Sequence, residues 1–294
     1  MEPPLLTVPN VSTGSADLAA RLAATLEGAE TRLLDVHSDP DHGRSVFSAA
    51  GSPAALVDAV VALAQHTADE IDVLASTAGQ HPHVGSLDVA PFVYADSRRR
   101  GAACAAALTS ACRIGELGIP VFLYGELTSD EQQSGRTRAQ LRAGGVTRLA
   151  ERIAAGELTP DFGPSAIHPT AGASLVAARG PLVAFNVVLD GADLRAASEV
   201  AALVREGGER GMPGLRAIGV LLSGHRAQVS MNVERPAELA LGEVVAAVQA
   251  LAPVASAEIV GLVPASALEG FPDAVPIEGF DPSRQVLENA LGSC

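Results

Sequence analysis

Hydrophobic and polar residues follow two different periods along the first 124 residues of the chain. Short apolar runs bounded by glycine, proline and acidic residues predict strands, whereas apolar positions that recur every three or four residues predict helices. The clearest helical pattern begins at Pro53, a residue favoured at the first helical position. The predicted elements, in order, are strand 5–11, helix 17–26, strands 31–36 and 44–50, helix 53–70, strand 86–94, helix 97–117 and strand 120–124.

The second half of the chain repeats the same order of elements. The order β-α-β-β-α-β is the split βαβ pattern of ferredoxin-like folds. The sequence therefore predicts an α+β fold in which two ferredoxin-like subdomains form a duplicated α/β sandwich with a groove between them, where ligand sites are favoured. The elements of the second half are strand 182–189, helix 192–205, strands 215–222 and 228–233, helix 237–251 and strand 258–263.

The repeated order of elements predicts two subdomains. We expect an N-terminal subdomain over residues 1–178 and a C-terminal subdomain over residues 179–270. Residues 271–294 contain several prolines and alternating acidic residues, which predict an irregular tail.

Bulk composition narrows the class of partner. The chain has 294 residues, of which 48% are hydrophobic and 18% charged, so it is expected to be a globular protein that folds around hydrophobic cores. Its net charge of -14 argues against nucleic acid or an anionic membrane surface as a partner, although a few arginines in one cleft could still bind a small anion. Three cysteines make no disulfide or metal framework, and no apolar stretch reaches the roughly twenty residues that span a bilayer. A cytoplasmic protein is expected.

Residues 80–91, with the sequence QHPHVGSLDVAP, are the most informative stretch for chemistry. They place His81 and His83 on a proline-stiffened turn directly before a predicted strand. A positioned imidazole exchanges protons near neutral pH and supplies roughly a hundredfold to ten-thousandfold in rate. The alternative is a structural turn histidine that is hydrogen-bonded to backbone. His37 or His42 could join the two as metal ligands, but zinc needs three or four well-placed ligands, so no metal is expected.

Several short motifs occur together and in a fixed order along residues 5–268, and with them the chain resembles the formiminotransferase domain family. Each motif alone is weak, whereas their order is specific for that family. The motifs are Val8 to Ser12, His81-Pro82 with Gly85 and Asp88-Val89, Val121 to Glu126, Pro160 to Pro164, Phe185-Asn186 after Gly172 and Arg179, Gln228 to Asn232, and Glu258 to Pro264.

The resemblance implies a fold, a reaction and partners. The resemblance implies that the chain consists of two α/β sandwich subdomains with a folate-binding groove between them, and that it is a homodimer. The family's reaction moves a formimino group from N-formimidoyl-L-glutamate to N5 of tetrahydrofolate during histidine breakdown. Tetrahydrofolate is thus implied as the acceptor substrate and formimidoylglutamate as the donor, with no nucleic acid, membrane or metal. The bifunctional relatives carry a cyclodeaminase domain as well, for which this chain has no room.

The resemblance also implies roles for single residues. The family's catalytic histidine aligns with His81, which would act as general base and then general acid. Gln80 and His83 stand where the family commonly has glutamate and arginine, so His83 bears on substrate binding and the donor is left open. The alternatives are a related folate-dependent formyl or formimino enzyme with a different donor, and a catalytically silent folate-binding relative.

The remaining candidates for substrate or folate binding each have an ordinary structural alternative. Arg44 could pair with a substrate carboxylate or lie at a strand start on the surface. Asp39 could orient His81 or bind the pterin, but an aspartate beside Pro40 is also common turn chemistry. Asn10 could donate to a ligand or cap the next helix. At Asp161 and Gly163 the backbone could approach folate closely or form a linker turn. Gln228 is a weaker candidate.

Overall fold

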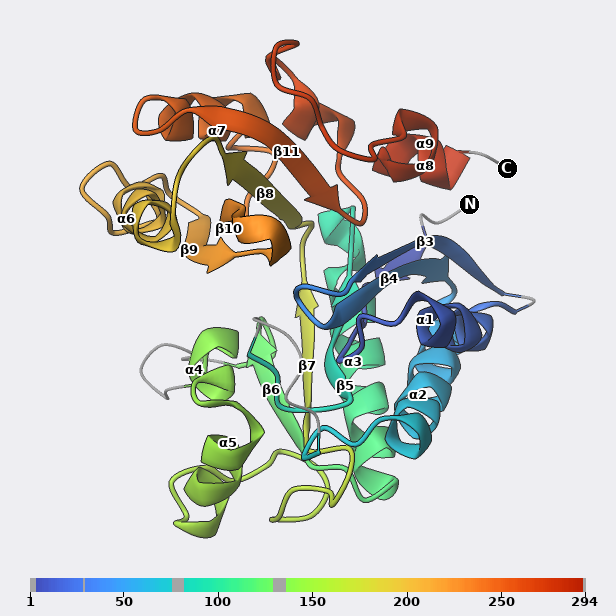
Figure 1. Ribbon diagram of the computed structural model, residues 1–294. Helices are drawn as coiled ribbons and strands as arrows, with labels where there is room; N and C mark the ends of the chain where they lie inside the picture. The colour runs from blue at the N-terminus through green and yellow to red at the C-terminus, as the bar shows by residue number, and fades with distance from the viewer. Residues whose placement is uncertain (1–3, 29, 76–81, 129–135, 293–294) are drawn as a thin grey trace. The chain divides into compact units, whose positions relative to one another are not determined.

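The computed structural model describes residues 4–28, 30–75, 82–128 and 136–292 and divides into two compact units (Figure 1). The first unit is Met1–Gly180 and the second is Pro181–Cys294. Each unit has a β-sheet and helices, so the expected α+β composition is confirmed. No helix among the described residues is long and apolar enough to cross a membrane.

The sheet of the first unit runs in the order β3-β4-β1/β2-β5-β7-β6, with β1 and β2 both lying between β4 and β5. β7 is parallel to both β5 and β6, and the other pairings are antiparallel. The strands are β1 (Leu5–Thr7), β2 (Asn10–Val11), β3 (Thr31–Asp39), β4 (Arg44–Gly51), β5 (Leu87–Val93), β6 (Val121–Gly125) and β7 (Ser174–Arg179).

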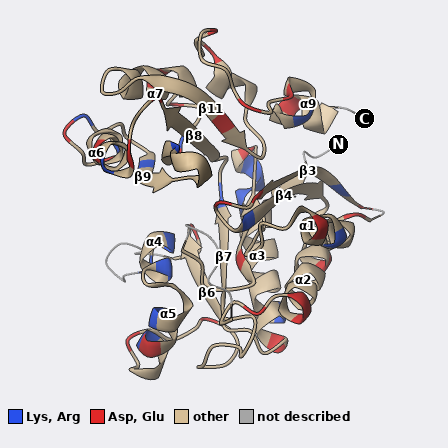
Figure 2. Ribbon diagram, in the orientation of Figure 1, with Lys and Arg blue, Asp and Glu red and all other residues tan. Residues whose placement is uncertain are grey.

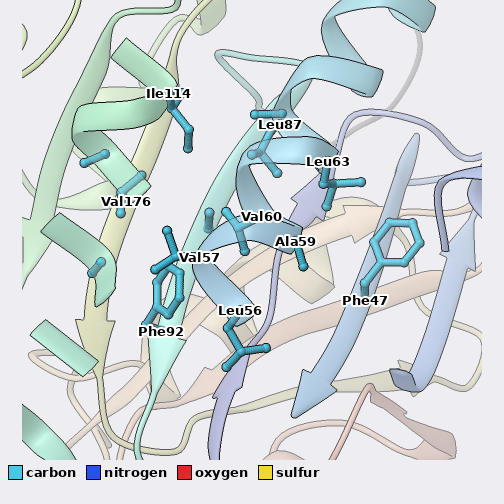
Figure 3. Packing of buried hydrophobic residues seen from close by; sticks show 14 of the residues in the cluster. Phe47, Leu56, Val57, Ala59, Val60, Leu63, Leu87, Phe92, Ile114 and Val176 are labelled. Carbon is cyan, nitrogen blue, oxygen red and sulfur yellow. The ribbon is translucent and has the colours of Figure 1, made fainter. Parts of the chain in front are cut away.

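Helices cover the two faces of this sheet differently. Apolar side chains of α1, α2 and α3 belong to one buried cluster with one face of the sheet, while α4 and α5 belong to a second cluster with β5, β6 and β7. Figure 3 shows the first cluster, in which Leu56, Val57 and Val60 of α2 lie near Phe92 of β5. The helical segments are α1 (Ala16–Ala23), η1 (Ala24–Leu26), α2 (Pro53–Glu70), η2 (Ser97–Arg99), α3 (Arg100–Glu116), α4 (Arg138–Arg142) and α5 (Gly145–Ala154).

The second unit has a four-stranded antiparallel sheet in the order β11-β8-β10-β9. Helices α6 and α7 pack on one face of this sheet and share its buried cluster. The elements are β8 (Val183–Leu189), α6 (Leu194–Val204), β9 (Leu215–Leu221), η3 (Ser223–His225), β10 (Ala227–Val233), α7 (Leu241–Gln249), β11 (Val254–Val260), η4 (Ala265–Leu268), α8 (Pro282–Gln285) and α9 (Leu287–Gly292). Residues 271–294, expected to be an irregular tail, thus contain two short helices.

The order of predicted elements is found in both units, but several details differ. The strand predicted over residues 5–11 is broken, because Pro9 has no N–H to donate to the sheet. Strand β11 begins at residue 254 instead of 258 and contains a bulge near its start. Helices α4 and α5 and strand β7 were not predicted. The β7 sequence, SLVAAR, is rich in alanine, which strands disfavour, and it forms a strand because both its neighbours pair with it.

Candidate functional site

One face of the first unit's sheet gathers several of the predicted site residues. Side chains alternate along a strand, and Phe47 of β4 faces the helical cluster, so Arg44 lies on the opposite face. Register pairs Arg44 with Asp39 of β3, and it pairs Val46 with Asn10 of β2. The structure therefore brings Asn10, Asp39 and Arg44 to the same face, where the Asn10 side chain donates to the carbonyl of Val8 (3.0 Å).

Asp39 is held by the turn that follows it. Its carboxylate accepts the backbone N–H of His42 at 3.0 Å and contacts the His42 ring nitrogen Nδ1 at 2.5 Å. His42 is 5% exposed and the Asp39 side chain 21%, so this contact is only partly shielded from water. Burial raises the pKa of Asp39, but the hydrogen bonds from His42 outweigh it and lower the pKa to about 2. Asp39 is therefore ionised at neutral pH and already has a partner.

A buried ion pair joins Asp88, just inside β5, to Arg142 at the end of α4. Asp88 is 2% exposed and Arg142 4%. One carboxylate oxygen of Asp88 accepts the backbone N–H of Val84 at 2.8 Å, and the other pairs with Nη2 of Arg142. The carboxylate thus links helix α4 to the segment that follows the two histidines in sequence.

Two arginines of α4, Arg138 and Arg142, act electrostatically on Arg44 of β4, and we call Arg44, Arg138 and Arg142 the arginine cluster. Burial, together with the charges of Arg142 and Arg138, lowers the pKa of Arg44 to about 10, against smaller opposing effects of Asp88 and Asp39. Figure 2 shows basic residues on α4, which carries two members of the cluster.

The histidine turn is described only from Pro82 onward, so His81 and Gln80 lie outside the described residues. The segment after them is tightly anchored. The Val84 carbonyl accepts the N–H of Ala173 at 2.9 Å, and the Gly85 carbonyl accepts the Ser12 hydroxyl at 2.7 Å. A side chain at Gly85 would meet the Ala173 carbonyl oxygen at 1.8 Å, so only glycine fits. His83 is partly buried within this anchored segment.

Asp161 and Gly163 are engaged with the protein itself. The Asp161 carboxylate accepts the backbone N–H of Leu123 at 2.7 Å and pairs with Arg136. Gly163 has a φ of +80°, and a side chain there would meet the Ile119 carbonyl oxygen at 2.6 Å. These contacts explain both residue types within the fold, and a folate contact at either one stays a prediction.

Gln228 belongs to the second unit, at the beginning of β10. It is buried, and its Oε1 atom has no hydrogen-bond partner among the described residues. On the same face of that sheet, Asn186 donates to Glu258 at 2.8 Å. An amide oxygen without a donor is consistent with ligand binding, but a role for Gln228 stays a prediction.

Three residues of this site carried no role in the sequence-based prediction: Asp88, Arg138 and Arg142. Asp88 lies 54 residues from Arg142, so no local pattern joins them. Helix α4 itself has a readable signal, because Thr137 and Gln140 form a capping box ahead of Arg142.

Comparison with known proteins defines the class of this α+β protein. Residues 5–179 match the family described as formiminotransferase domain, N-terminal subdomain. The chain belongs to the formiminotransferase domain family, which confirms the family predicted from the sequence motifs and makes the chain a transferase.

Relatives match the chain over most of its length. It is 35% identical over 297 residues to glutamate formimidoyltransferase from Streptococcus pyogenes serotype M1, covering 97% of both chains. It is 34% identical over 297 residues to glutamate formimidoyltransferase from Thermoplasma acidophilum, covering 97% of this chain and 96% of the relative. Formimidoyltransferase-cyclodeaminase from Mus musculus is 33% identical over 280 residues, which are 89% of this chain and 50% of the relative.

Proposed function

We propose that this chain transfers the formimino group of N-formimidoyl-L-glutamate to N5 of tetrahydrofolate and releases glutamate. The observation that carries the proposal is the match to glutamate formimidoyltransferase over 97% of both chains. Tetrahydrofolate is then the acceptor substrate, and the reaction needs no metal. We also propose a cytoplasmic homodimer, as the family resemblance suggests.

The chemistry asks for one group that moves protons in both directions. Attack by N5 on the amidine carbon forms the new N–C bond and a tetrahedral intermediate. Breaking the bond from that carbon to the glutamate nitrogen then releases glutamate. The N5 proton must leave, and the departing nitrogen must gain one, so a single imidazole can serve as base and then as acid. We assign both roles to His81, whose sequence neighbours Val84 and Gly85 are firmly anchored.

Binding of the two substrates is proposed for the polar face of the first unit's sheet. Asn10, Asp39 and Arg44 share that face, and His83 follows His81 in sequence. Asp161 and Gly163 are proposed as further folate contacts in the first unit, and Gln228 is proposed as a folate contact in the second unit.

We propose that both units are ferredoxin-like halves of a duplicated fold. In each unit the first strand of the β-α-β-β-α-β order lies between the third and fourth strands in the sheet. In the first unit these strands are β1/β2, β4 and β5, and in the second they are β8, β10 and β11. The first unit adds β7 and β6 beyond its fourth strand.

Gln80 and His83 favour a second candidate function, because they depart from the family pattern at the proposed catalytic turn. This candidate is a related enzyme with a different formimino or formyl donor, or a silent folate-binding relative. In both cases folate binding is retained.

The test is formation of 5-formimidoyltetrahydrofolate by wild type, His81→Ala and the control His66→Ala. His66 is exposed on α2, so its loss is expected to leave the rate unchanged. His81→Ala is expected to lower kcat roughly a hundredfold to ten-thousandfold. Folate binding without turnover in wild type would favour the second candidate, and absence of folate binding would contradict both.

A further inference from the structure

We infer that His168 is a positioning residue, because its ring fixes a turn that holds the backbone on both sides of His81 in sequence. Residues 168–172 form this turn, and we call it the His168 turn. The inference rests on the proposed function, since positioning matters for the reaction only if His81 moves the protons. His168 acts through hydrogen bonds to backbone, so its effect on the chemistry is indirect.

Backbone hydrogen bonds close the His168 turn and place it against the segment that follows His81. The His168 N–H donates to the Gly172 carbonyl at 2.8 Å, and the Gly172 N–H donates to the His168 carbonyl at 3.1 Å. A side chain at Gly172 would meet the Val84 carbonyl oxygen at 2.3 Å. The backbone of the turn therefore lies directly on the backbone of Val84.

Two consecutive carbonyls of the turn hold the chain before and after His81. The Thr170 carbonyl accepts the N–H of Val73 at 2.9 Å, and the Ala171 carbonyl accepts the N–H of Ser86 at 2.9 Å. Val73 and Ser86 are each 1% exposed. Because a buried N–H without an acceptor is costly, both carbonyls have to keep their directions. The turn therefore fixes the backbone at one point before His81 and at one point after it.

The His168 ring sets the direction of the first of these carbonyls. Its Nδ1 atom accepts the N–H of Ala171 at 3.0 Å and the N–H of Thr170 at 3.3 Å. The Ala171 N–H and the Thr170 carbonyl belong to one trans peptide group, in which they point in opposite directions. His168 thus holds one side of this peptide group, and Val73 donates to the other side.

The position of the acceptor atom within the side chain decides which residues can do this. Nδ1 is bonded to Cγ of the imidazole, and Oδ1 of asparagine is bonded to the same carbon of its own side chain. Asparagine accepts backbone N–H groups two residues further on in Asx turns. Leucine has no acceptor, and it would leave the N–H of Ala171, a residue that is 1% exposed, without a partner. The peptide group would then lose the bond that orients it.

A change in this peptide group would reach the reaction through Val73 and Ser86. A group that transfers protons has to lie within hydrogen-bond reach of both nitrogens, and a misplacement of about 1 Å costs roughly a hundredfold in rate. The proposed substrate contacts Asn10 and Arg44 lie on β2 and β4, outside the turn. Loss of the His168 acceptor should therefore lower kcat and leave both KM values nearly unchanged.

The experiment uses the full chain and compares His168→Leu, His168→Asn and the control Ser52→Ala. His168→Leu is expected to lower kcat roughly tenfold to a hundredfold at nearly constant KM. His168→Asn should restore most of that kcat, because Oδ1 can accept the same N–H groups. Ser52 caps the N-terminus of α2 through the N–H of Ala55, so Ser52→Ala should destabilise the first unit and keep kcat.

Three outcomes overturn the inference. They are a folded His168→Leu that keeps the wild-type kcat, a loss of kcat that His168→Asn does not restore, and a loss that Ser52→Ala reproduces. A rise in KM at unchanged kcat also overturns it. If His168→Leu does not fold, His168→Gln replaces it, because glutamine stays polar but carries its oxygen one bond further from the backbone. The same loss of kcat is then expected.

Amide hydrogen exchange distinguishes failure of this inference from failure of the proposed function, because it needs no turnover. The N–H groups of Val73 and Ser86 should exchange roughly tenfold faster in His168→Leu than in the wild type, and His168→Asn should restore the slow rates. The N–H of Ala257, which donates to the Pro276 carbonyl at 2.9 Å in the second unit, is the internal reference. Unchanged exchange at Val73 and Ser86 overturns the inference whether or not the wild type is active. Faster exchange beside an inactive wild type supports the anchoring and counts against the proposed function alone.

Discussion

Replacing Asp88 by asparagine should destabilise the first unit strongly through its effect on Arg142. Asparagine keeps an oxygen that can accept the N–H of Val84, so that hydrogen bond survives. The second carboxylate oxygen becomes an amide, and Arg142 loses its partner while both positions stay buried. Arginine cannot shed its proton to escape the cost.

The size of the destabilisation follows from the buried Arg142 charge that loses its partner. Removing one partner of a buried ion pair typically costs about 3 to 5 kcal/mol, because the remaining charge is uncompensated. In a unit of this size, 1 kcal/mol corresponds to a change of roughly 2 to 4 °C in the melting temperature. Asp88→Asn should therefore lower that temperature by roughly 6 to 20 °C.

Thermal unfolding followed by circular dichroism measures this difference, with Glu151→Gln as the control. Glu151 pairs with Arg148 on the surface, where an ion pair contributes at most about 1 kcal/mol. A double variant, Asp88→Asn with Arg142→Met, should recover part of the loss, because it removes the stranded charge. If Asp88→Asn melts within 2 to 3 °C of the control variant, or if the double variant is no better, the role given to the buried pair is wrong.

Two further predictions concern packing and pH. Gly85→Ala should lower the free energy of unfolding by about 2 to 3 kcal/mol or more, because the new methyl group collides with the Ala173 carbonyl. Gly101→Ala is the control, because it lies in helix α3 with open space around it, and it should raise the free energy of unfolding by about 0.5 to 1 kcal/mol. Urea unfolding of both variants checks this, and similar midpoints would contradict it. The ionised Asp39 should stabilise the fold above about pH 4, and this contribution should disappear as the pH falls toward 2, the value to which contact with His42 lowers its pKa. The difference in unfolding free energy between wild type and Asp39→Asn should shrink over that interval, and a constant difference would refute the assignment.

Local signals in the sequence predicted most elements, and they failed where distant parts of the chain decide the structure. Helix α2 was predicted at its observed bounds, because Pro53 stands in its first turn and its apolar residues keep a helical period. Strand β7 escaped prediction because its alanine-rich sequence has no strand pattern of its own. It becomes a strand only through pairing with β5 and β6.

The candidate site divides in the same way. The resemblance to a family singled out His81 and Arg44, whereas the pairing of Arg44 with Asp39 across β3 and β4 is seen only in the structure. The link from Asp88 to Arg142 spans 54 residues and depends on how α4 packs against the sheet. No periodicity or motif in the sequence could have given that pair.

The position of β7 also constrains how the first unit can be made. Within the described residues, β6 joins the sheet through β7, which is synthesised about 50 residues later. Until residues 174–179 have left the ribosome, β5 and β6 each have an edge with unpaired backbone groups. Such edges are prone to pair with other chains, and closure by a distant strand is slow. A nascent chain of residues 1–173 therefore has sheet edges that are open to pairing with other chains. Synthesis of β7 (Ser174–Arg179) allows these edges to be covered.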